Sequence, residues 1–334
     1  MNPKISVIIA ARNEEKNIEK CLRNIPEYKN LEVIVVDDSS NDKTYEIAKN
    51  FKADYDLKIF RNETPKGNAY SWDHGVKKSS GELIFLLSAD AELNSFDDAI
   101  KHFDDPKVVQ VHQKVKIIGE ENNFISKFMP IYQRYANYIP FIKKGIRKET
   151  ELKNVNVCDS HALMRKSFYL EVNPLVDKAC GEEYRFNDVG GKILDNKGYK
   201  VVYESKFIEI RRQPRDMKSF LIQQRWYGRN MLVAYSLFDK RNIPKFFRYA
   251  LIVFLILALS YFFTKNYLLF VLTIFSCILL LARLFSGIPS LKKKEIVYLP
   301  FIFWIIILGD LAYNYGFLQS FLNKIFAGKW LINK

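Results

Sequence analysis

Long uncharged runs near the end of the chain constrain its fold more than any other feature. Three of them cover residues 249–264, 266–282 and 296–309. Helices of soluble proteins rarely stay apolar on all faces for this long, whereas a membrane span needs about 20 apolar residues. The first two runs are short for a span, but the flanking Arg248 and Arg283 can lengthen them by snorkelling. The pattern predicts a C-terminal membrane region, residues 241–334, with two or three transmembrane helices.

The distribution of charge points to lipid as a partner and not to nucleic acid. The chain carries a net charge of +14, and residues 246–334 contain nine Lys or Arg against two acidic residues, a net +7. Basic residues beside apolar runs suit a surface of anionic lipid better than a nucleic-acid groove. Basic loops tend to stay on the cytoplasmic side, so the "SGIPSLKKKE" loop and the N-terminal domain are predicted to share that side. The last apolar segment either crosses the membrane or lies along its surface.

The N-terminus and the cysteines fit a cytoplasmic domain. No basic segment, long apolar core and small-residue cleavage site precede the first strand-like run, so translocation of the first domain is not expected. The four cysteines are widely separated, without CxxC spacing or a disulfide framework. We therefore expect a multi-pass protein of the cell membrane whose catalytic domain faces the cytoplasm.

The beginning of the chain alternates strand and helix patterns. Residues 5–11, "ISVIIAA", and 31–38, "LEVIVVDD", are strand-like, and residues 13–25 between them have helical periodicity. The unbroken apolar run of residues 33–36 favours a strand buried on both faces, as parallel sheets require. An α/β domain is predicted for residues 1–240, with ligands at the carboxyl ends of its strands.

A second cycle of the same kind follows. The segments are a strand at 55–62, a turn and helix at 66–79, a buried strand at 82–90 and a further strand at 108–118. The strand at 82–90 again ends in acidic residues. Acidic groups therefore gather at the predicted ligand-binding edge.

Candidate ligand groups lie at the ends of three early strands. These are Ala10, Arg12 and Glu14 at the end of the first strand, Asp37 and Asp38 at the end of the second, and Asp90 and Glu92 at the end of the fourth. The first two loops also fit helix capping, by Asn13 in one and by Ser39 or Ser40 in the other. Taken singly, the loops leave both interpretations open.

Taken together, four segments resemble the inverting family 2 glycosyltransferases, which have the GT-A fold. The segments are "ISVIIAARNEE", "VIVVDDSSNDKT", "KGNAYSWDHGV" and "LIFLLSADAE", in this order and spacing. The resemblance is specific over residues 4–92 and continues more loosely to about residue 235. It implies an NDP-sugar donor, with residues 1–115 binding the nucleotide sugar and residues 116–240 forming the acceptor side.

The resemblance also implies roles for single residues on the donor side. Nucleotide-contacting residues would be Ala10, Arg12 and Glu14, with Asp38 recognising the base and Lys66, Gly67 and Asn68 beside the ribose and diphosphate. Asp90 and Glu92 match the DxD-type motif, with Glu in place of the second Asp. Their spacing turns both carboxylates to one side of an extended segment, which suits Mg²⁺ or Mn²⁺ gripped together with the sugar.

The acceptor side follows the family pattern less closely. The catalytic base of an inverting transfer is expected at Asp188, or at Glu183, about one helical turn further from "GYKVVYE" than the family spacing. His161 falls in a segment resembling the acceptor-side loop. Arg225 and Trp226 resemble the aromatic and basic helix near acceptor and diphosphate, and equally fit a helix on the membrane surface. Their spacing differs from the QxxRW form of processive synthases, so processive synthesis is disfavoured.

We therefore expect transfer of a sugar, with inversion, to a lipid-linked acceptor such as a polyprenyl-diphosphate glycan. A membrane anchor would hold the site next to that lipid pool. Three alternatives remain. The first is a polyprenyl-phosphate monosaccharide synthase similar to the dolichyl-phosphate mannose enzymes. The second is a sugar nucleotidyltransferase, but such an enzyme should open with a glycine-rich loop, which is absent between Ala10 and Asn17. The third is an inactive membrane scaffold. The sequence makes no prediction of sugar, nucleobase or oligomeric state.

Overall fold

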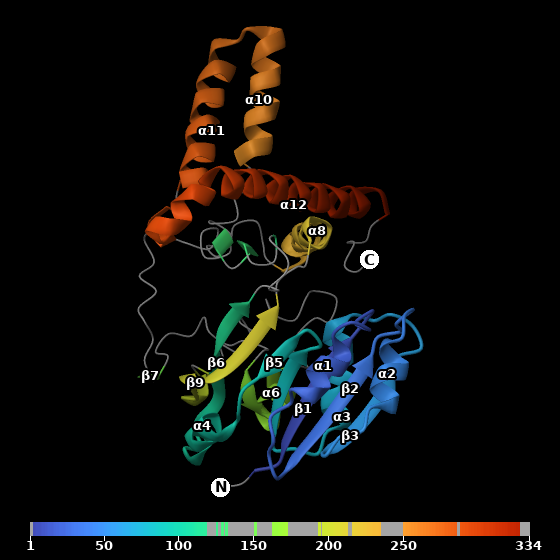
Figure 1. Cartoon of the computed structure of the whole chain (residues 1–334). Coiled ribbons are helices and arrows are strands. Elements are labelled where there is room, and N and C mark those ends of the chain that lie inside the picture. The colour runs from blue at the N-terminus through green and yellow to red at the C-terminus, as the bar shows by residue number, and fades with distance from the viewer. Residues whose placement is uncertain are drawn as a thin grey trace. The chain divides into compact units, whose positions relative to one another are not determined.

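A computed structural model describes residues 3–118, 125, 128–129, 131–132, 150–151, 162–172, 193–194, 196–212, 216–234, 250–285 and 288–327. Its elements are β1 (Ile5–Ala11), α1 (Ile18–Arg23), β2 (Leu31–Asp37), α2 (Thr44–Asn50), β3 (Asp56–Arg61), α3 (Asn68–Lys78), β4 (Leu83–Ser88), β5 (Ala91–Leu93), α4 (Asp97–Ile100), η1 (Lys101–Asp104), β6 (Val108–Ile118), β7 (Thr150–Glu151), β8 (Leu163–Arg165), α6 (Lys166–Val172), β9 (Lys200–Arg212), α8 (Met217–Ala234), α10 (Ala250–Thr264), α11 (Tyr267–Phe285), η5 (Ile288–Ser290), η6 (Lys293–Tyr298) and α12 (Leu299–Ala327) (Figure 1).

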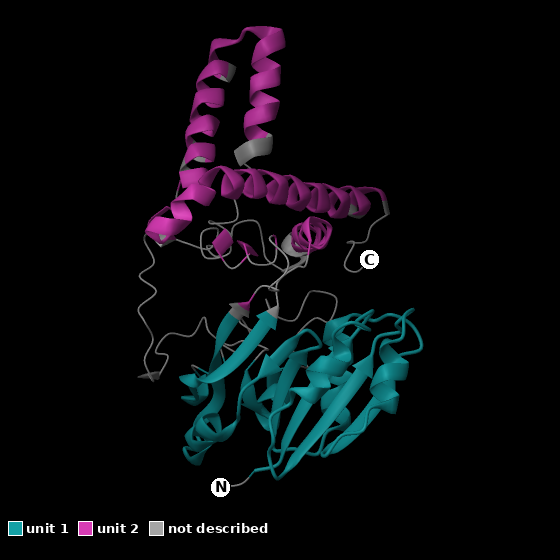
Figure 2. Ribbon diagram, viewed as in Figure 1, with its two compact units in different colours: residues 1–117, 145–212 teal, residues 118–144, 213–334 magenta. Residues whose placement is uncertain are grey.

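The chain divides into two compact units. Unit 1 contains residues 1–117 and 145–212, and unit 2 contains residues 118–144 and 213–334 (Figure 2). Helix α8 thus groups with the C-terminal helices. The functional boundaries near residues 115 and 240 stay predictions.

Unit 1 is built on a mixed sheet. Its described strands follow the order β3-β2-β1-β4-β8-β6-β9-β5, with β7 beside β9. Strand β1 pairs in parallel with β2 and β4, and β2 pairs in parallel with β3. The short strand β8 is antiparallel to β4 and β6, and β9 is antiparallel to β5 and β7. The predicted α/β fold is confirmed, and β1 to β4 form the parallel part of the sheet.

The central strands are buried on both faces, as their unbroken apolar runs predict. Every residue of β1 and β2 is buried. Alternate side chains of β1 enter two cores: Ile5 and Ile9 lie in the core that includes residues of α1 and α2, and Ile8 lies in the core that includes residues of α3 and α6. Helices therefore cover both faces of the sheet, which leaves the strand ends as its polar surface.

The strand predictions hold more closely than the first helix prediction. Strands β1 and β6 have the predicted bounds, β2 is one residue shorter at its end, and β3 is one residue shorter at each end. The helix expected over residues 13–25 is wrong at its start, because α1 begins only at Ile18 and ends at Arg23. Residue Asn13 has a φ of 58°, a left-handed conformation that a helix cannot contain.

Unit 2 is helical in its described part. Side chains of α8 and α12 share a core with Phe128, Met129 and Tyr132, and its buried members include Phe220 and Ile305. One described helix is long and apolar enough to cross a membrane, Lys293–Asn323, and α10 supplies a shorter apolar segment, Val253–Thr264. The number of spans stays a prediction.

Candidate functional site

The carboxyl ends of β1, β2 and β4 bring the predicted donor-side loops together. The sheet register places Ala10 opposite Val36 on one side and opposite Ser88 on the other. The loops that follow these strands therefore start at one edge of the sheet. Three predicted segments, at Ala10, Asp38 and Asp90, share this edge.

Asp38 is buried and holds the turn that leads into α3. Its Oδ1 accepts a hydrogen bond from the backbone N–H of Lys66, and its Oδ2 accepts one from the backbone N–H of Gly67, each at 2.8 Å. Only 1% of the residue is exposed. Gly67 has φ 89° and ψ 164°, a conformation essentially restricted to glycine. Asp38 and Gly67 thus fix where α3 begins.

A side-chain network behind Asp38 was missed by the sequence reasoning. The amide Nδ2 of Asn62 donates to Asp38 Oδ1 at 2.8 Å and to Ser71 Oγ at 2.9 Å. Nδ1 of His74 lies 3.2 Å from Asn62 Oδ1, which can only accept, so Nδ1 carries a proton. Burial and then the nearby Lys78 lower the pKa of His74. The position of Asn62 at the end of a predicted strand, residues 55–62, is the only sequence signal that could have pointed to it.

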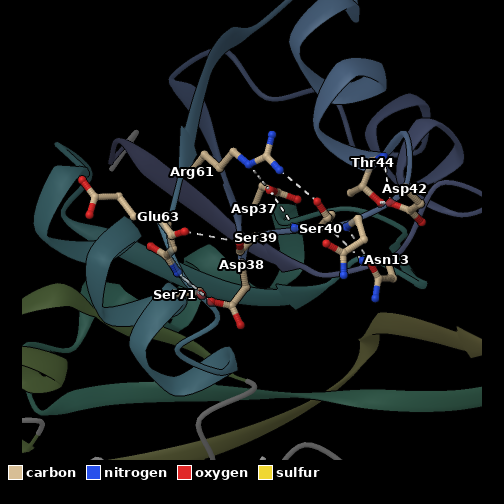
Figure 3. Close-up of polar contacts among 12 residues, drawn as sticks. Asn13, Asp37, Asp38, Ser39, Ser40, Asp42, Thr44, Arg61, Glu63 and Ser71 are labelled. Atoms are coloured by element: carbon tan, nitrogen blue, oxygen red, sulfur yellow. Dashed lines mark hydrogen bonds and ion pairs between the residues drawn. The ribbon is translucent and has the colours of Figure 1, made fainter. Parts of the chain in front are cut away.

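The loops after β1 and β2 bind each other. The backbone N–H of Asn13 donates to Ser40 Oγ at 3.0 Å, and the backbone N–H of Asn41 donates to Asn13 Oδ1 at 2.9 Å. The backbone N–H of Glu14 donates to Thr44 Oγ1 at 2.7 Å. Figure 3 shows these side chains between the two loops. Neither α1 nor α2 has a side-chain hydrogen bond at its N-cap, so the capping interpretation is wrong.

The other acid of the second loop has a structural partner. Asp37 is fully buried, and its Oδ2 lies 3.2 Å from Arg61 Nε and accepts from the backbone N–H of Ser40 at 3.1 Å. Arg61 also donates to the backbone oxygen of Ser40 at 2.9 Å (Figure 3). Asp37 is therefore neutralised by a cation within the fold. Asp38 accepts instead from an amide and two backbone N–H groups within the described residues, and none of these donors is charged.

Asp90 and Glu92 line one shallow pocket. The other lining residues are Asn17, Lys20, Cys21, Ala89 and Ala91. Burial, followed by the charges of Asp90, Glu92 and Glu14, raises the pKa of the Cys21 thiol. Three predicted acids from two loops thus act on one buried thiol. The described residues contain no group of three His, Cys, Asp or Glu side chains arranged as a metal site.

A lysine occupies the acidic pocket as well. Nζ of Lys20 lies 3.5 Å from Glu92 Oε1, and 18% of the Glu92 side chain is exposed. Sequence reasoning missed this contact, because Lys20 and Glu92 are far apart in the chain. Glu14 also has a local partner, since its Oε2 accepts from Asn17 Nδ2 at 2.6 Å.

The remaining donor-side candidates lie at the surface of the same loops. Lys66 and Asn68 are exposed, and Arg12 is half-buried. The acceptor-side predictions Asp188, Glu183 and His161 lie outside the described residues.

Arg225 and Trp226 belong to α8 in unit 2. Nε of Arg225 donates to Gln319 Oε1 at 2.8 Å, and its guanidinium lies 4.7 Å from the ring centre of Tyr315. Trp226 is 40% exposed. The roles of both residues toward an acceptor stay predictions.

Comparison with known proteins gives a consistent picture. A sequence model described as glycosyl transferase family 2 matches residues 6–172, half of the chain. The chain is 31% identical over 148 residues to a poly-beta-1,6-N-acetyl-D-glucosamine synthase of Staphylococcus epidermidis, covering 42% of this chain and 35% of that protein. It is 37% identical over 100 residues to a GalNAc(5)-diNAcBac-PP-undecaprenol beta-1,3-glucosyltransferase of Campylobacter jejuni, covering 28% and 31%. The chain thus spans about a third of the length of these curated relatives.

A solved structure supports the fold. The mannosyltransferase PcManGT of Pyrobaculum calidifontis, in complex with GDP-Man and Mn²⁺, superposes with a TM-score of 0.54 at 16% identity, covering 95% of this chain and 88% of that one. At this identity the likeness concerns the fold alone. It agrees with the GT-A architecture expected from the sequence.

Proposed function

Because the chain belongs to glycosyl transferase family 2, we propose that it transfers a sugar from an NDP-sugar to a lipid-linked acceptor, with inversion, while attached to a membrane. The observation that carries the proposal is the edge where β1, β2 and β4 end. There the buried carboxylate of Asp38, whose donors among the described residues are all neutral, lies at the same edge of one sheet as the pocket of Asp90 and Glu92. A base-recognition end and a diphosphate end are what a nucleotide sugar requires.

Asp38 suits recognition of a base. A carboxylate can accept about four hydrogen bonds, and three donors within the described residues already fix its orientation. A base N–H would add a further charge-assisted hydrogen bond at a preformed position. Asp38 also holds the turn at Lys66 and Gly67. This turn places the exposed Lys66 ammonium, and the backbone of Gly67, which has no side chain, close to Asp38.

The acidic pocket fits Mg²⁺ or Mn²⁺. Carboxylate oxygens are the ligands that these hard cations prefer, and Asp90 and Glu92 line one pocket. The nearby Lys20 ammonium is consistent with a site that attracts positive charge. A bound divalent cation would supply neutralisation of the leaving diphosphate.

The chain's own residues would carry the remaining steps. The acceptor oxygen attacks the anomeric carbon while the bond from that carbon to the diphosphate breaks and its electron pair goes to the diphosphate. Asp188 or Glu183 would remove the proton of an acceptor hydroxyl. An acceptor that is already an ionised phosphate needs no base, which is the alternative of a polyprenyl-phosphate monosaccharide synthase.

A lipid-linked acceptor is supported by two independent features. The described α10 and α11 helices expose many large apolar side chains, among them Leu259, Phe263 and Leu268. The Campylobacter relative is, by its name, an enzyme acting on an undecaprenol-linked glycan. We propose a multi-pass protein of the cell membrane with unit 1 on the cytoplasmic face, next to its acceptor.

Donor binding tests the proposal directly. UDP-, GDP- and dTDP-sugars are titrated into the detergent-solubilised full chain with and without Mn²⁺, for the wild type, Asp90→Ala and Asp98→Ala. Asp98 is the matched control, because it is an acid paired with Lys101 on α4 outside the pocket. We expect one donor to bind in a Mn²⁺-dependent manner, with binding lost only in Asp90→Ala. Failure of every donor to bind would overturn the proposal and favour the inactive scaffold.

A further inference from the structure

Helix α12 has a buried face and an exposed apolar face on opposite sides. Its buried face includes Ile302, Ile306 and Tyr313. On the other side, large exposed residues recur at intervals of three, four or seven: Trp304, Leu311, Tyr315, Leu318, Leu322 and Ile325. We call these six residues the outer stripe. Because the described part of unit 2 leaves the outer stripe exposed, something apolar is expected to cover it.

Helix α8 is closely packed on the buried side of α12. A Cβ atom at Gly228 would lie 1.8 Å from the backbone oxygen of Tyr313, and one at Gly316 would lie 2.0 Å from the backbone oxygen of Arg225. The two backbones therefore touch where the glycines meet, and α8 cannot separate from α12 without losing this contact. Wherever α12 lies in a membrane, α8 accompanies it.

Helix α8 is too polar for the hydrocarbon core. Arg225 and Arg229 both donate to Gln319 Oε1, at 2.8 Å and 3.0 Å, so two guanidinium groups lie beside the last third of α12, eight residues before its end. Lys218 and Ser219 on α8 are exposed. A cation at the centre of a bilayer costs about 3 kcal/mol or more on insertion scales. If α12 crossed the membrane, it would draw these groups toward that depth.

The length of α12 also disfavours a crossing. Helix α12, Leu299–Ala327, has 29 residues. At about 1.5 Å per residue it is roughly 44 Å long, whereas the hydrocarbon core is about 30 Å thick. A helix lying in the membrane surface has no such mismatch.

The hairpin of α10 and α11 identifies the occupant as a lipid bilayer. Figure 1 shows this hairpin rising from one side of α12 and α8 lying on the other side. The hairpin exposes apolar residues along its length, with Lys265 and Asn266 at its tip. Lys292, Lys293 and Lys294 precede α12, so cations stand at its beginning, where anionic lipid headgroups would lie.

We propose that α12 lies in the plane of the membrane surface, with its outer stripe in an anionic lipid bilayer, and that α10 and α11 alone cross. Trp304 and Tyr315 then lie at the interface, which amphipathic aromatic rings favour. Arg225 and Arg229 lie on the aqueous side at the level of lipid phosphates. Both ends of the membrane region are on the same side, and the inference rests on the membrane attachment given under the proposed function.

Depth measurements along α12 test the proposal. Single spin labels are attached to Cys at positions 304, 311, 318 and 325 in the full chain, with its four native cysteines replaced, in vesicles containing anionic lipid. These positions are seven residues apart on the outer stripe, so their helix spans about 31 Å. We expect four similar, shallow depths from collisional accessibility to oxygen and to a water-soluble nickel complex.

Labels on α10 are the matched control. Ile256, Leu259 and Phe263 are 59%, 60% and 75% exposed, and their depths should differ by about 10 Å from first to last if α10 crosses. A depth gradient along α12 as steep as that along α10 would overturn the in-plane helix while leaving membrane attachment intact. Absence of lipid exposure at both helices would overturn the in-plane helix together with membrane attachment. Donor binding by each labelled chain confirms that it is folded.

Discussion

Two buried carboxylates lie at opposite ends of β2, and their partners differ. Glu32, near the start of the strand, accepts from Lys58 Nζ at 2.8 Å and from the Ser6 and Ser80 hydroxyls and the backbone N–H groups of Ser80 and Gly81. Asp38, just after the end of the strand, accepts only from neutral groups within the described residues. One carboxylate is paired with a cation inside the protein, whereas the described donors to the other are all neutral.

The two carboxylates differ in role: Glu32 stabilises the fold, and Asp38 is the proposed ligand group. Burial by itself raises the pKa of Glu32, but hydrogen bonds from Lys58, Ser6 and Ser80 outweigh it and lower the pKa to about 2. Glu32 thus ties β1 and β3 to the turn before β4 at the amino edge. At the opposite, carboxyl edge, Asp38 is instead held by Asn62 and by the backbone N–H groups of Lys66 and Gly67.

Replacing the amino-edge carboxylate should have the largest effect, on stability. A pKa lowered from 4.5 to about 2 corresponds to at most about 3 kcal/mol at about 1.4 kcal/mol per unit. Because the folded-state pKa is depressed, this stabilisation is present above pH 4.5 and is lost as the pH falls toward 2. We expect Glu32→Gln to unfold at a lower temperature than the wild type at pH 7, with the difference closing between pH 4.5 and pH 2.

Thermal unfolding of the full chain in detergent, followed from pH 7 to pH 2, measures this. Glu82→Gln is the control, since Glu82 is an exposed acid close to the same turn. Equal loss of stability in both variants would show that the hydrogen bonds of Glu32 contribute no more to the free energy of unfolding than an exposed acid does. Donor affinity of Glu32→Gln should match that of the wild type at a temperature where both are folded.

Replacing Asp38, at the carboxyl edge, should lower donor affinity more than it lowers the unfolding temperature. Asp38→Asn keeps the size of the side chain but removes the charge and one of the two acceptor oxygens that hold Lys66 and Gly67. A hydrogen bond to a charged group contributes about 1.5–3 kcal/mol, so donor affinity should fall by about 100-fold. Calorimetric titration of the donor identified with the wild type measures the loss.

The pair of variants sharpens the comparison. Asp54→Asn, at an exposed acid between α2 and β3, should leave both donor affinity and unfolding unchanged. Asp38→Asn that binds the donor normally but unfolds early would assign Asp38 to the fold and leave base recognition to another residue. A loss of affinity with little change in unfolding temperature would support the proposed role.

Sequence predicted the positions of the strands and of Asp38 because these depend on local patterns. Unbroken apolar runs such as residues 33–36 indicate strands buried on both faces, and the acids at their ends must lie at one edge of a parallel sheet. The start of α1 could not be predicted in this way. It is set by hydrogen bonds between Asn13 and a loop nearly thirty residues further along the chain.

The partners of the candidate residues depend on tertiary contacts that no local pattern encodes. Asn62 directly follows β3 and donates to Asp38, which directly follows the neighbouring strand β2. Arg61, at the end of β3, pairs with Asp37 at the end of β2. Each of these side chains is ordinary in its own segment. The acids were found because they stand at the ends of apolar strands, whereas a single Asn after a strand or a Lys on a surface helix gives no such signal.

Removal of Lys20 should have the smallest effect and tests the metal end of the comparison. The Lys20 ammonium lies 3.5 Å from Glu92 Oε1, so a divalent cation must displace it or bind beside a like charge. Because 54% of the Lys20 side chain is exposed, the pair is screened, and such pairs contribute about 0.2–1 kcal/mol. We expect Lys20→Met to bind Mn²⁺ about two- to fivefold more tightly than the wild type, measured by paramagnetic resonance of free Mn²⁺ without donor.

Lys16→Met is the control, because Lys16 is exposed one turn earlier and lines no part of the pocket. Similar tightening in both variants would indicate only the loss of one positive charge from the surface. Weaker Mn²⁺ binding by Lys20→Met would place the cation away from Glu92. Selective tightening would mean that Glu92 exchanges an internal cation for the metal, whereas the described donors to Asp38 are all neutral.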